Sequence, residues 1–189
     1  MAQGTAATVV KQKKKWFTVL SPEMFGGREI ADVPAFAAED LKGRSLEVAG
    51  QMLSGSPKDM NKKYILQVIE LKGDKGVTLP KGFYITESFI QRSARKYKEK
   101  FVYVPTLEAK DKKKVKLKLY FFNTKKLHHS VRAALLRISE EQTKNFVADT
   151  DSVKMFDPLT VEKFTADLRK TLTQVYPIEK VLLVKIKLL

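Results

Sequence analysis

Three lysines at every second position give this sequence its clearest chemical signal. Lys114, Lys116 and Lys118 alternate with apolar residues between positions 114 and 119. On a β-strand, alternate side chains point to the same face and are about 6.6 Å apart, twice the rise per residue. Such a row can contact several phosphates of a nucleic acid and release their counterions. The spacing therefore predicts a phosphate-binding strand, although any one of these lysines taken alone is more often a solvated charge.

The lysine row belongs to a longer basic stretch between Arg92 and Arg137. This stretch holds 15 of the 36 Lys and Arg residues but only three of the 21 acids, so it carries +12 of the net charge of +15. The stretch also contains many apolar residues, which a disordered basic tail would lack. A concentrated block of one charge sign predicts where a polyanion binds. The predicted RNA-binding residues in this stretch are Arg92, Arg95, Lys96, Lys98, Lys112, Lys113, Lys114, Lys116, Lys118, Lys125, Lys126 and Arg132.

A second basic group near the N-terminus consists of Lys11, Lys13, Lys14 and Lys15. Residues 1–15 are small and polar and then basic, a composition that cannot bury enough apolar surface to fold alone. Trp16 follows directly and offers a ring that can stack on a base. We therefore expect a basic N-terminal extension over residues 1–15, which binds RNA together with Trp16. A single α+β RNA-binding domain is predicted over residues 16–189.

Other aromatic residues admit two interpretations. Tyr97, Tyr103 and Tyr120 lie among the basic residues and could also stack on bases. Most aromatic residues of a β-rich domain belong to the core, which is the favoured interpretation for Phe101, Phe121 and Phe122.

Composition excludes several classes of protein. With 189 residues, 43% of them hydrophobic, the chain can form a sizeable core, and its pI near 9.8 is typical of a basic nucleic-acid binder. The absence of cysteine excludes disulfides, Cys-ligated zinc and a Cys nucleophile. No apolar run approaches the roughly 18 residues of a membrane helix, and the N-terminus does not resemble a signal peptide. We expect a cytoplasmic protein without a membrane partner.

Catalytic motifs are not found in the sequence. The search covered the P-loop, the glycine-rich dinucleotide-binding loop, the HExxH zinc motif and the GxSxG nucleophile motif. His128 and His129 are adjacent, so on a helix they diverge and cannot chelate one metal ion well. A surface helix start is the favoured interpretation of the pair, and a contact with RNA is the alternative. Glu140 and Glu141 diverge in the same way, which favours an ordinary solvated pair. We expect no enzyme activity, cofactor, metal or small-molecule substrate.

Strands and helices must position the basic residues. Period-two patterns predict strands at residues 16–20, 43–49, 62–71, 100–109, 112–122 and 184–188. Residues 28–40 look like a loop or a short helical turn around Pro34, and four Gly and Pro residues interrupt the segment from 73 to 82. Residues 108–114 are expected to form a basic hairpin tip. Helical spacing predicts a helix capped by Thr86, a second from about 128 to 147, and a third that begins at Asp157-Pro158. Together these elements predict an α+β fold, with an antiparallel-rich, β-barrel-like core of about six strands and about three helices packed outside.

Six segments carry a resemblance to a known family: Lys14–Phe17, Ser21–Phe25, Leu41–Val48, Thr86–Arg92, Lys116–Phe122 and Arg169–Lys187. The last is the most specific, because a helix is followed there by Tyr-Pro and a basic strand. In these segments the chain resembles the small-subunit ribosomal proteins of archaea and eukaryotes called eS-one, or S-three-Ae. The resemblance spans about residues 11–189 and fits the shorter archaeal-type form, without the extension usual in eukaryotic members.

The resemblance implies a β-barrel core with helices outside, located on the small-subunit platform near the mRNA exit. It implies ribosomal RNA of the small subunit, near its 3′ end, and neighbouring ribosomal proteins as partners, with mRNA near the exit as a possible further one. It brings no catalytic residues. Two alternatives stay open on the residues alone: a freestanding DNA- or chromatin-binding protein, and an RNA-modifying enzyme, which would need a pocket with convergent polar groups.

Overall fold

The fold was examined in a computed structural model, which describes residues 13–189; Lys11 of the predicted basic extension lies outside them. The strands are β1 (Lys15–Leu20), β2 (Glu29–Ala35), β3 (Ser45–Ala49), β4 (Lys62–Lys72), β5 (Lys75–Ile85), β6 (Glu99–Tyr103), β7 (Thr106–Glu108), β8 (Lys114–Asn123) and β9 (Lys180–Leu188). The α-helices are α1 (Gly50–Ser54), α2 (Glu87–Ala94), α3 (His129–Asp149) and α4 (Pro158–Val175).

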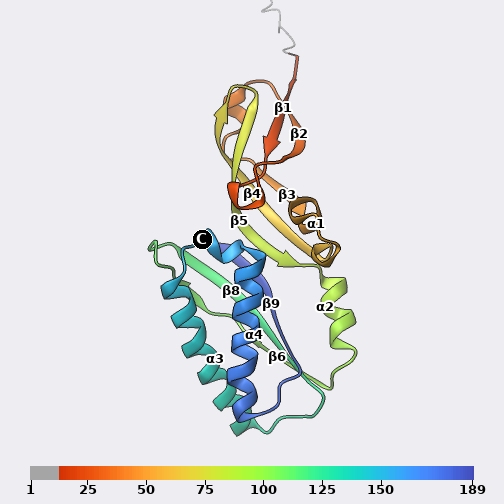
Figure 1. Ribbon diagram of the computed structural model, residues 1–189, viewed down its shortest axis with the longest axis vertical. Coiled ribbons are helices and arrows are strands. Elements are labelled where there is room, and N and C mark those ends of the chain that lie inside the picture. Colours follow the sequence, from red (N-terminus) through yellow and green to blue (C-terminus); the bar gives the residue numbers. More distant parts are fainter. Residues whose placement is uncertain (1–12) are drawn as a thin grey trace, which may run out of the picture.

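The molecule is elongated and has two lobes (Figure 1). The upper lobe is formed by β1, β2 and the turn end of the β4–β5 hairpin. The lower lobe contains β6, β7, β8 and β9 with α2, α3 and α4, while β3 and α1 lie between the lobes. The predicted basic strand and the N-terminal basic residues therefore belong to different lobes.

The nine described strands form one mixed sheet in which β5 is the branching strand. One edge of β5 pairs with β4, whereas the other pairs with β1 near Gly76 and with β9 near Phe83. Only the β1–β5 pair is parallel. The predicted α+β class with an antiparallel-rich sheet is confirmed, with nine strands and four α-helices over residues 13–189. The sheet is open, because the change of partner along β5 divides it into two arms.

Two strands differ from the sequence-based expectation. β2 occupies part of the segment predicted as a loop, and β5 passes through the Gly and Pro residues predicted to interrupt regular structure. The glycines of β5 serve close packing, since a Cβ on Gly82 would lie 3.3 Å from the Ile65 side chain. Pro80 lies between the β5 segments that pair with β1 and with β9, where a residue without an N–H is tolerated.

The main core lies between the β6–β8–β9 part of the sheet and the helices α3 and α4, which cover one face of it (Figure 1). Leu117, Leu119 and Phe121 of β8 are fully buried there, and the Phe121 ring stacks on Phe101 with 4.7 Å between centroids. Because strand side chains alternate, Lys114, Lys116, Lys118 and Tyr120 point to the opposite face. We call this opposite face of β5, β8 and β9 the open face.

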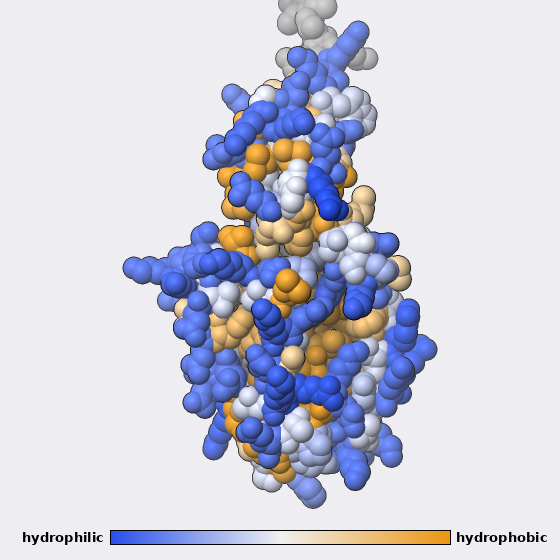
Figure 2. Space-filling model, in the orientation of Figure 1, coloured by the Kyte–Doolittle hydropathy of each residue, from blue (hydrophilic) through white to orange (hydrophobic). Residues whose placement is uncertain are grey.

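A smaller core fills the upper lobe and consists of Phe17, Val19, Ala35, Leu41 and Val68. Leu46 of β3 packs against both cores, which links the two lobes. On the helix-bearing side of the molecule, hydrophilic side chains predominate, with smaller hydrophobic areas among them (Figure 2). In the described part of the chain, no helix has both the length and the apolar composition to cross a membrane.

The N-cap residues predicted from the sequence agree with the observed starts of α2 and α4. α2 begins after Thr86, as predicted, although the Thr86 side chain forms no capping hydrogen bond. α4 begins at Pro158, and the carboxylate of its N-cap Asp157 accepts hydrogen bonds from the Thr160 N–H (3.2 Å) and hydroxyl (3.0 Å). The predicted cap is therefore confirmed in both position and chemistry.

Replacing Asp157 by Ala is expected to lower the free energy of unfolding by about 1 kcal/mol, because the N–H groups of the first turn of α4 lose their acceptor. Urea denaturation followed by circular dichroism measures the change. Asp167→Ala is the matched control, since Asp167 lies within the same helix and makes only an exposed ion pair with Lys170. Equal effects of the two substitutions would contradict a capping role.

Candidate nucleic-acid interface

Four lysines from two adjacent strands form the centre of the open face. The register of β8 and β9 pairs Lys116 with Lys187 and Lys118 with Lys185. Directly opposed residues of adjacent strands point to the same face, so the four lysines lie on one side of the sheet. We call these four residues the lysine quartet. Like charges directly opposite each other on a sheet are destabilising, so this arrangement is explained most simply by an anionic partner.

Acidic side chains do not neutralise the quartet. In residues 13–189, the ion pairs use other lysines: Lys62, Lys63, Lys75, Lys144, Lys154 and Lys170. Two of the three acids in the basic stretch instead hold loops in place. The Glu99 carboxylate accepts a hydrogen bond from the Leu127 N–H, and Asp111 accepts from the Ser152 hydroxyl at 2.8 Å and N–H at 3.2 Å.

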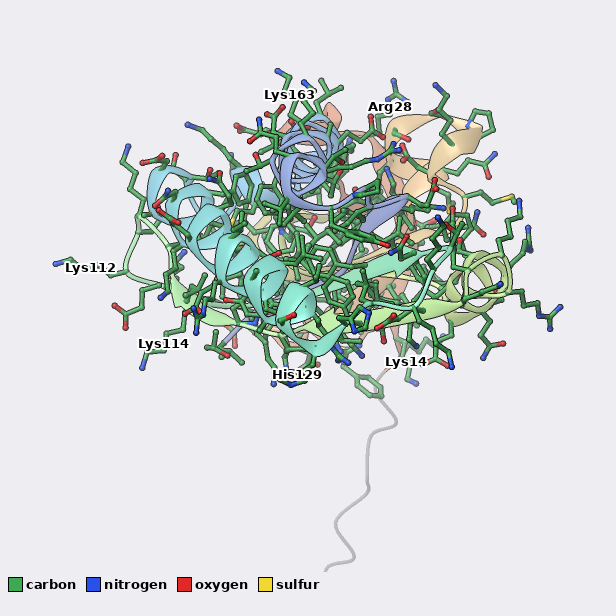
Figure 3. The ribbon with its side chains drawn as sticks, turned by 90° about the horizontal axis from the view of Figure 1, so that it is seen from below. Lys14, Arg28, Lys112, Lys114, His129 and Lys163 are labelled. Carbon is green, nitrogen blue, oxygen red and sulfur yellow. The ribbon has the colours of Figure 1, made fainter. Side chains whose placement is uncertain are left out.

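The β7–β8 hairpin extends the basic surface beyond the quartet. Lys112 and Lys113 are exposed at its turn, and Lys112 adopts a left-handed backbone conformation with φ 59°. Figure 3 shows Lys112 projecting away from the body of the molecule, with Lys114 nearby at the start of β8. The predicted hairpin turn is therefore confirmed as a basic protrusion.

A further basic group surrounds the end of α2 and contains the exposed residues Arg92, Arg95, Lys96 and Lys98. Lys180 of β9 lies beside it, where its ammonium donates a hydrogen bond to the Ser93 hydroxyl at 3.3 Å. Partial burial, and then the charge of Lys96, lowers the pKa of Lys180. A phosphate bound here would offset both effects and favour the charged amine.

The start of α3 carries the last predicted group, the exposed residues Lys125, Lys126 and Arg132. The Arg132 guanidinium lies 5.8 Å from the centre of the Phe101 ring. His128 is the N-cap of α3 and His129 its first residue, both exposed, which confirms that the histidines mark a surface helix start. In residues 13–189, no group of three or more His, Asp or Glu side chains is arranged to hold a metal ion.

The N-terminal group is not brought to the quartet. Lys13, Lys14 and Lys15 are exposed at the start of β1 in the upper lobe (Figure 1), and Trp16 is 70% exposed. Seen along the long axis, however, Lys14, Lys114 and His129 lie on one side of the molecule, and Lys163 and Arg28 on the other (Figure 3). A polyanion running along the molecule on that side would meet both groups.

Sequence reasoning missed half of the quartet. Lys185 and Lys187 stood in a strand predicted from its alternation, but their neighbours on the sheet were unknown. Lys100 was also missed, and its ammonium lies 4.9 Å from the centre of the Tyr120 ring. Only the alternation at residues 184–188 could have signalled Lys185 and Lys187, because strand pairing is not encoded locally.

The aromatic residues divide as the favoured interpretation expected. Phe101, Phe121 and Phe122 are at most 1% exposed and belong to the core. Tyr103 lies opposite Leu119, on the face covered by the helices. The Tyr97 ring packs on the Phe122 ring, with 5.5 Å between the ring centroids. Tyr120 remains half-buried on the open face, beside the quartet, and is the aromatic residue best placed to meet a base there.

Comparisons with known proteins give this surface its context. The sequence profile of the Ribosomal S3Ae family matches residues 7–189. The small ribosomal subunit protein eS1 of Archaeoglobus fulgidus is 28% identical, over 100% of this chain and 92% of its own length. The protein of that name from Staphylothermus marinus is 26% identical, over 93% of this chain and 83% of its own length. The one from Methanobrevibacter smithii is also 26% identical, over 94% of this chain and 92% of its own length. The profile match includes every basic group described above, and the chain belongs to the Ribosomal S3Ae family.

Proposed function

We propose that this protein is a structural constituent of the small ribosomal subunit and binds ribosomal RNA through the open face. The observation that carries this proposal is the lysine quartet, which has no carboxylate at salt-bridge distance among residues 13–189. Contacts of lysine with phosphates fix position without reading sequence, so RNA shape selects the site. Family membership supports the ribosome, in the cytoplasm, as the setting and supports a structural role.

The other basic groups act as outlying phosphate contacts. The hairpin turn, the end of α2 and the start of α3 surround the quartet within the lower lobe. Lys13, Lys14, Lys15 and Trp16 extend the contact to a separate RNA segment near the upper lobe. Lys11 belongs to the same proposed extension. The family resemblance adds the platform near the mRNA exit as the location, with neighbouring ribosomal proteins, and mRNA at the exit, as further partners.

Co-sedimentation with small ribosomal subunits at high salt tests this proposal. We expect the full chain to stay bound after a wash that removes loosely associated proteins, because an assembled constituent is held by many phosphate contacts at once. A freestanding DNA-binding protein or a transiently acting RNA-modifying enzyme would be washed off. Release of the chain, together with preference for duplex DNA over ribosomal RNA in competition, would favour the DNA-binding alternative and overturn the proposal.

A further inference from the structure

Two hollows on the open face lie next to each other, because Lys118 and Lys185 line both, and together they are called the groove. The larger, of about 540 Å³, lies between the sheet and α2, and its lining includes Tyr84, Tyr120, Glu87, Gln91 and Lys100. The smaller, of about 390 Å³, is further lined by Lys116, Lys187, Val104, Leu117 and Leu189. We call the larger one the aromatic hollow. Its volume is within the range of about 300–1,000 Å³ that is typical of small-ligand sites.

Two tyrosines supply flat apolar surface in the aromatic hollow. The Tyr120 ring has the ammonium groups of Lys100 and Lys118 at 4.9 and 5.1 Å from its centre. The second ring, of Tyr84, is half-buried and lies on β5, next to β9. Both ammonium groups lie over the Tyr120 ring, so the phosphates of a bound RNA would draw them off the ring face, which then offers a stacking surface to a base of a single strand.

A charged pair from the neighbouring strands lies beside the Tyr84 ring. Glu47 of β3 pairs with Lys63 of β4 at 2.6 Å, and the Lys63 ammonium lies 5.9 Å from the centre of the Tyr84 ring. Hydrogen bonding to Glu47 raises the pKa of Tyr84. Glu47 and Lys63 therefore line the side of Tyr84 that faces β3 and β4.

Charges on the two sides of the aromatic hollow are opposite in sign. α2 contributes Glu87 and Gln91, whereas the sheet contributes Lys100, Lys118 and Lys185. Glu87 would repel phosphate, so a nucleotide bound here would place its backbone over the lysines and its base toward α2. The Gln91 amide and the Glu87 carboxylate would then face the polar edge of the base.

We propose that this groove binds a single-stranded RNA segment, with one unstacked base in the aromatic hollow and the flanking phosphates on the lysine quartet. In a duplex the faces of the bases are already stacked and cannot contact the tyrosines, so the occupant is single-stranded. The inference rests on the proposed RNA-binding function and names the form of RNA that the open face selects.

The first test uses the unmodified full chain and two short RNA oligonucleotides of equal length. One carries bases and the other is built entirely of abasic nucleotides, so that both have the same backbone charge. We expect the base-bearing strand to bind about ten- to a hundredfold more tightly in fluorescence anisotropy, as stacking of one base predicts. Equal affinities for the two strands would overturn the inference without any variant being needed.

The second test assigns the effect to residues. Tyr120→Leu and Tyr84→Leu should each lower the affinity for the base-bearing strand about tenfold or more and leave the abasic strand unaffected. Tyr103→Leu is the matched control, because that half-buried tyrosine lies on the helix-covered face. A loss with Tyr103→Leu as large as with Tyr120→Leu would overturn the assignment.

A lysine variant separates the failure of this inference from the failure of the proposed function. Lys116→Gln combined with Lys187→Gln should weaken the binding of both strands, since it removes only charge. If the lysine variant weakens both strands but the tyrosine variants weaken neither, the base site is wrong and phosphate binding at the open face stands. If the lysine variant weakens neither strand, the proposed function of the open face is wrong as well.

Discussion

Replacement of all four quartet lysines by glutamine is expected to weaken the binding of structured ribosomal RNA about a hundredfold at moderate salt. Exposed ion pairs contribute up to about 1 kcal/mol each, and four of them are lost together. The dependence of log Kd on log salt should become shallower by about 3 to 4, because each phosphate contact releases slightly less than one counterion. Filter binding or anisotropy over a salt series measures both quantities.

Replacement of the quartet lysines should not destabilise the fold. Lys116 faces Lys187 and Lys118 faces Lys185, so the substitutions remove repulsion between directly opposed charges. We therefore expect the free energy of unfolding to stay the same or to rise slightly. A binding defect accompanied by marked destabilisation would be evidence against a purely electrostatic role of the quartet.

The matched control removes the same charge from elsewhere on the surface, with Lys42, Lys58, Lys72 and Lys163 changed to glutamine. All four are exposed, and Lys163 lies on the side of the molecule away from Lys114 (Figure 3). We expect only a small loss of affinity, through the lower net charge. If this variant loses as much affinity as the quartet variant, total charge and not the open face determines binding.

Phe121→Ala is expected to lower the free energy of unfolding by about 3–5 kcal/mol, the usual range when a buried aromatic side chain is removed. Phe121 is fully buried under the helices, and its ring stacks on Phe101. Its loss leaves a cavity that the surrounding sheet and helices cannot fill completely. Urea denaturation measures the change, and Phe36→Ala, at a 47% exposed phenylalanine of the upper lobe, should have a far smaller effect.

The same variant tests the proposal that residues 16–189 form a single domain. β4 and β5 run through both lobes, and Leu46 packs against both cores. Destabilisation at Phe121 should therefore speed native-state hydrogen exchange at the Val19 and Val68 amides of the upper lobe as much as at the amides of β8. Unchanged exchange in the upper lobe would mean that the two lobes unfold independently.

Features that depend on neighbours in the chain were predictable. The alternation around Lys116, the turn before Lys114 and the Asp157 cap follow from periods and termini that a few consecutive residues encode. The burial of Phe121 was expected for a different reason, because most aromatic residues of a β-rich domain belong to the core. For these features, the local preference and the final structure agree.

β5 shows why other features were not predictable. Gly76, Pro80 and Gly82 read locally as breaks, yet they lie in a strand of 11 residues. Their suitability depends on what packs beside them, such as the Ile65 side chain next to Gly82, and on the change of partner from β1 to β9. Neither condition can be seen within a window of neighbouring residues.

The sequence by itself determined how much positive charge this protein carries, which stretch holds most of it, and that its lysines alternate with core residues. Only the tertiary structure decided which lysines lie side by side. Lys185 and Lys187 come long after Lys118 in the chain and meet the row of Lys116 only because β9 pairs with β8 in one register. A one-residue slip of that register would turn these lysines to the helix-covered face, so burial of the apolar residues between them selects the surface that RNA is proposed to bind.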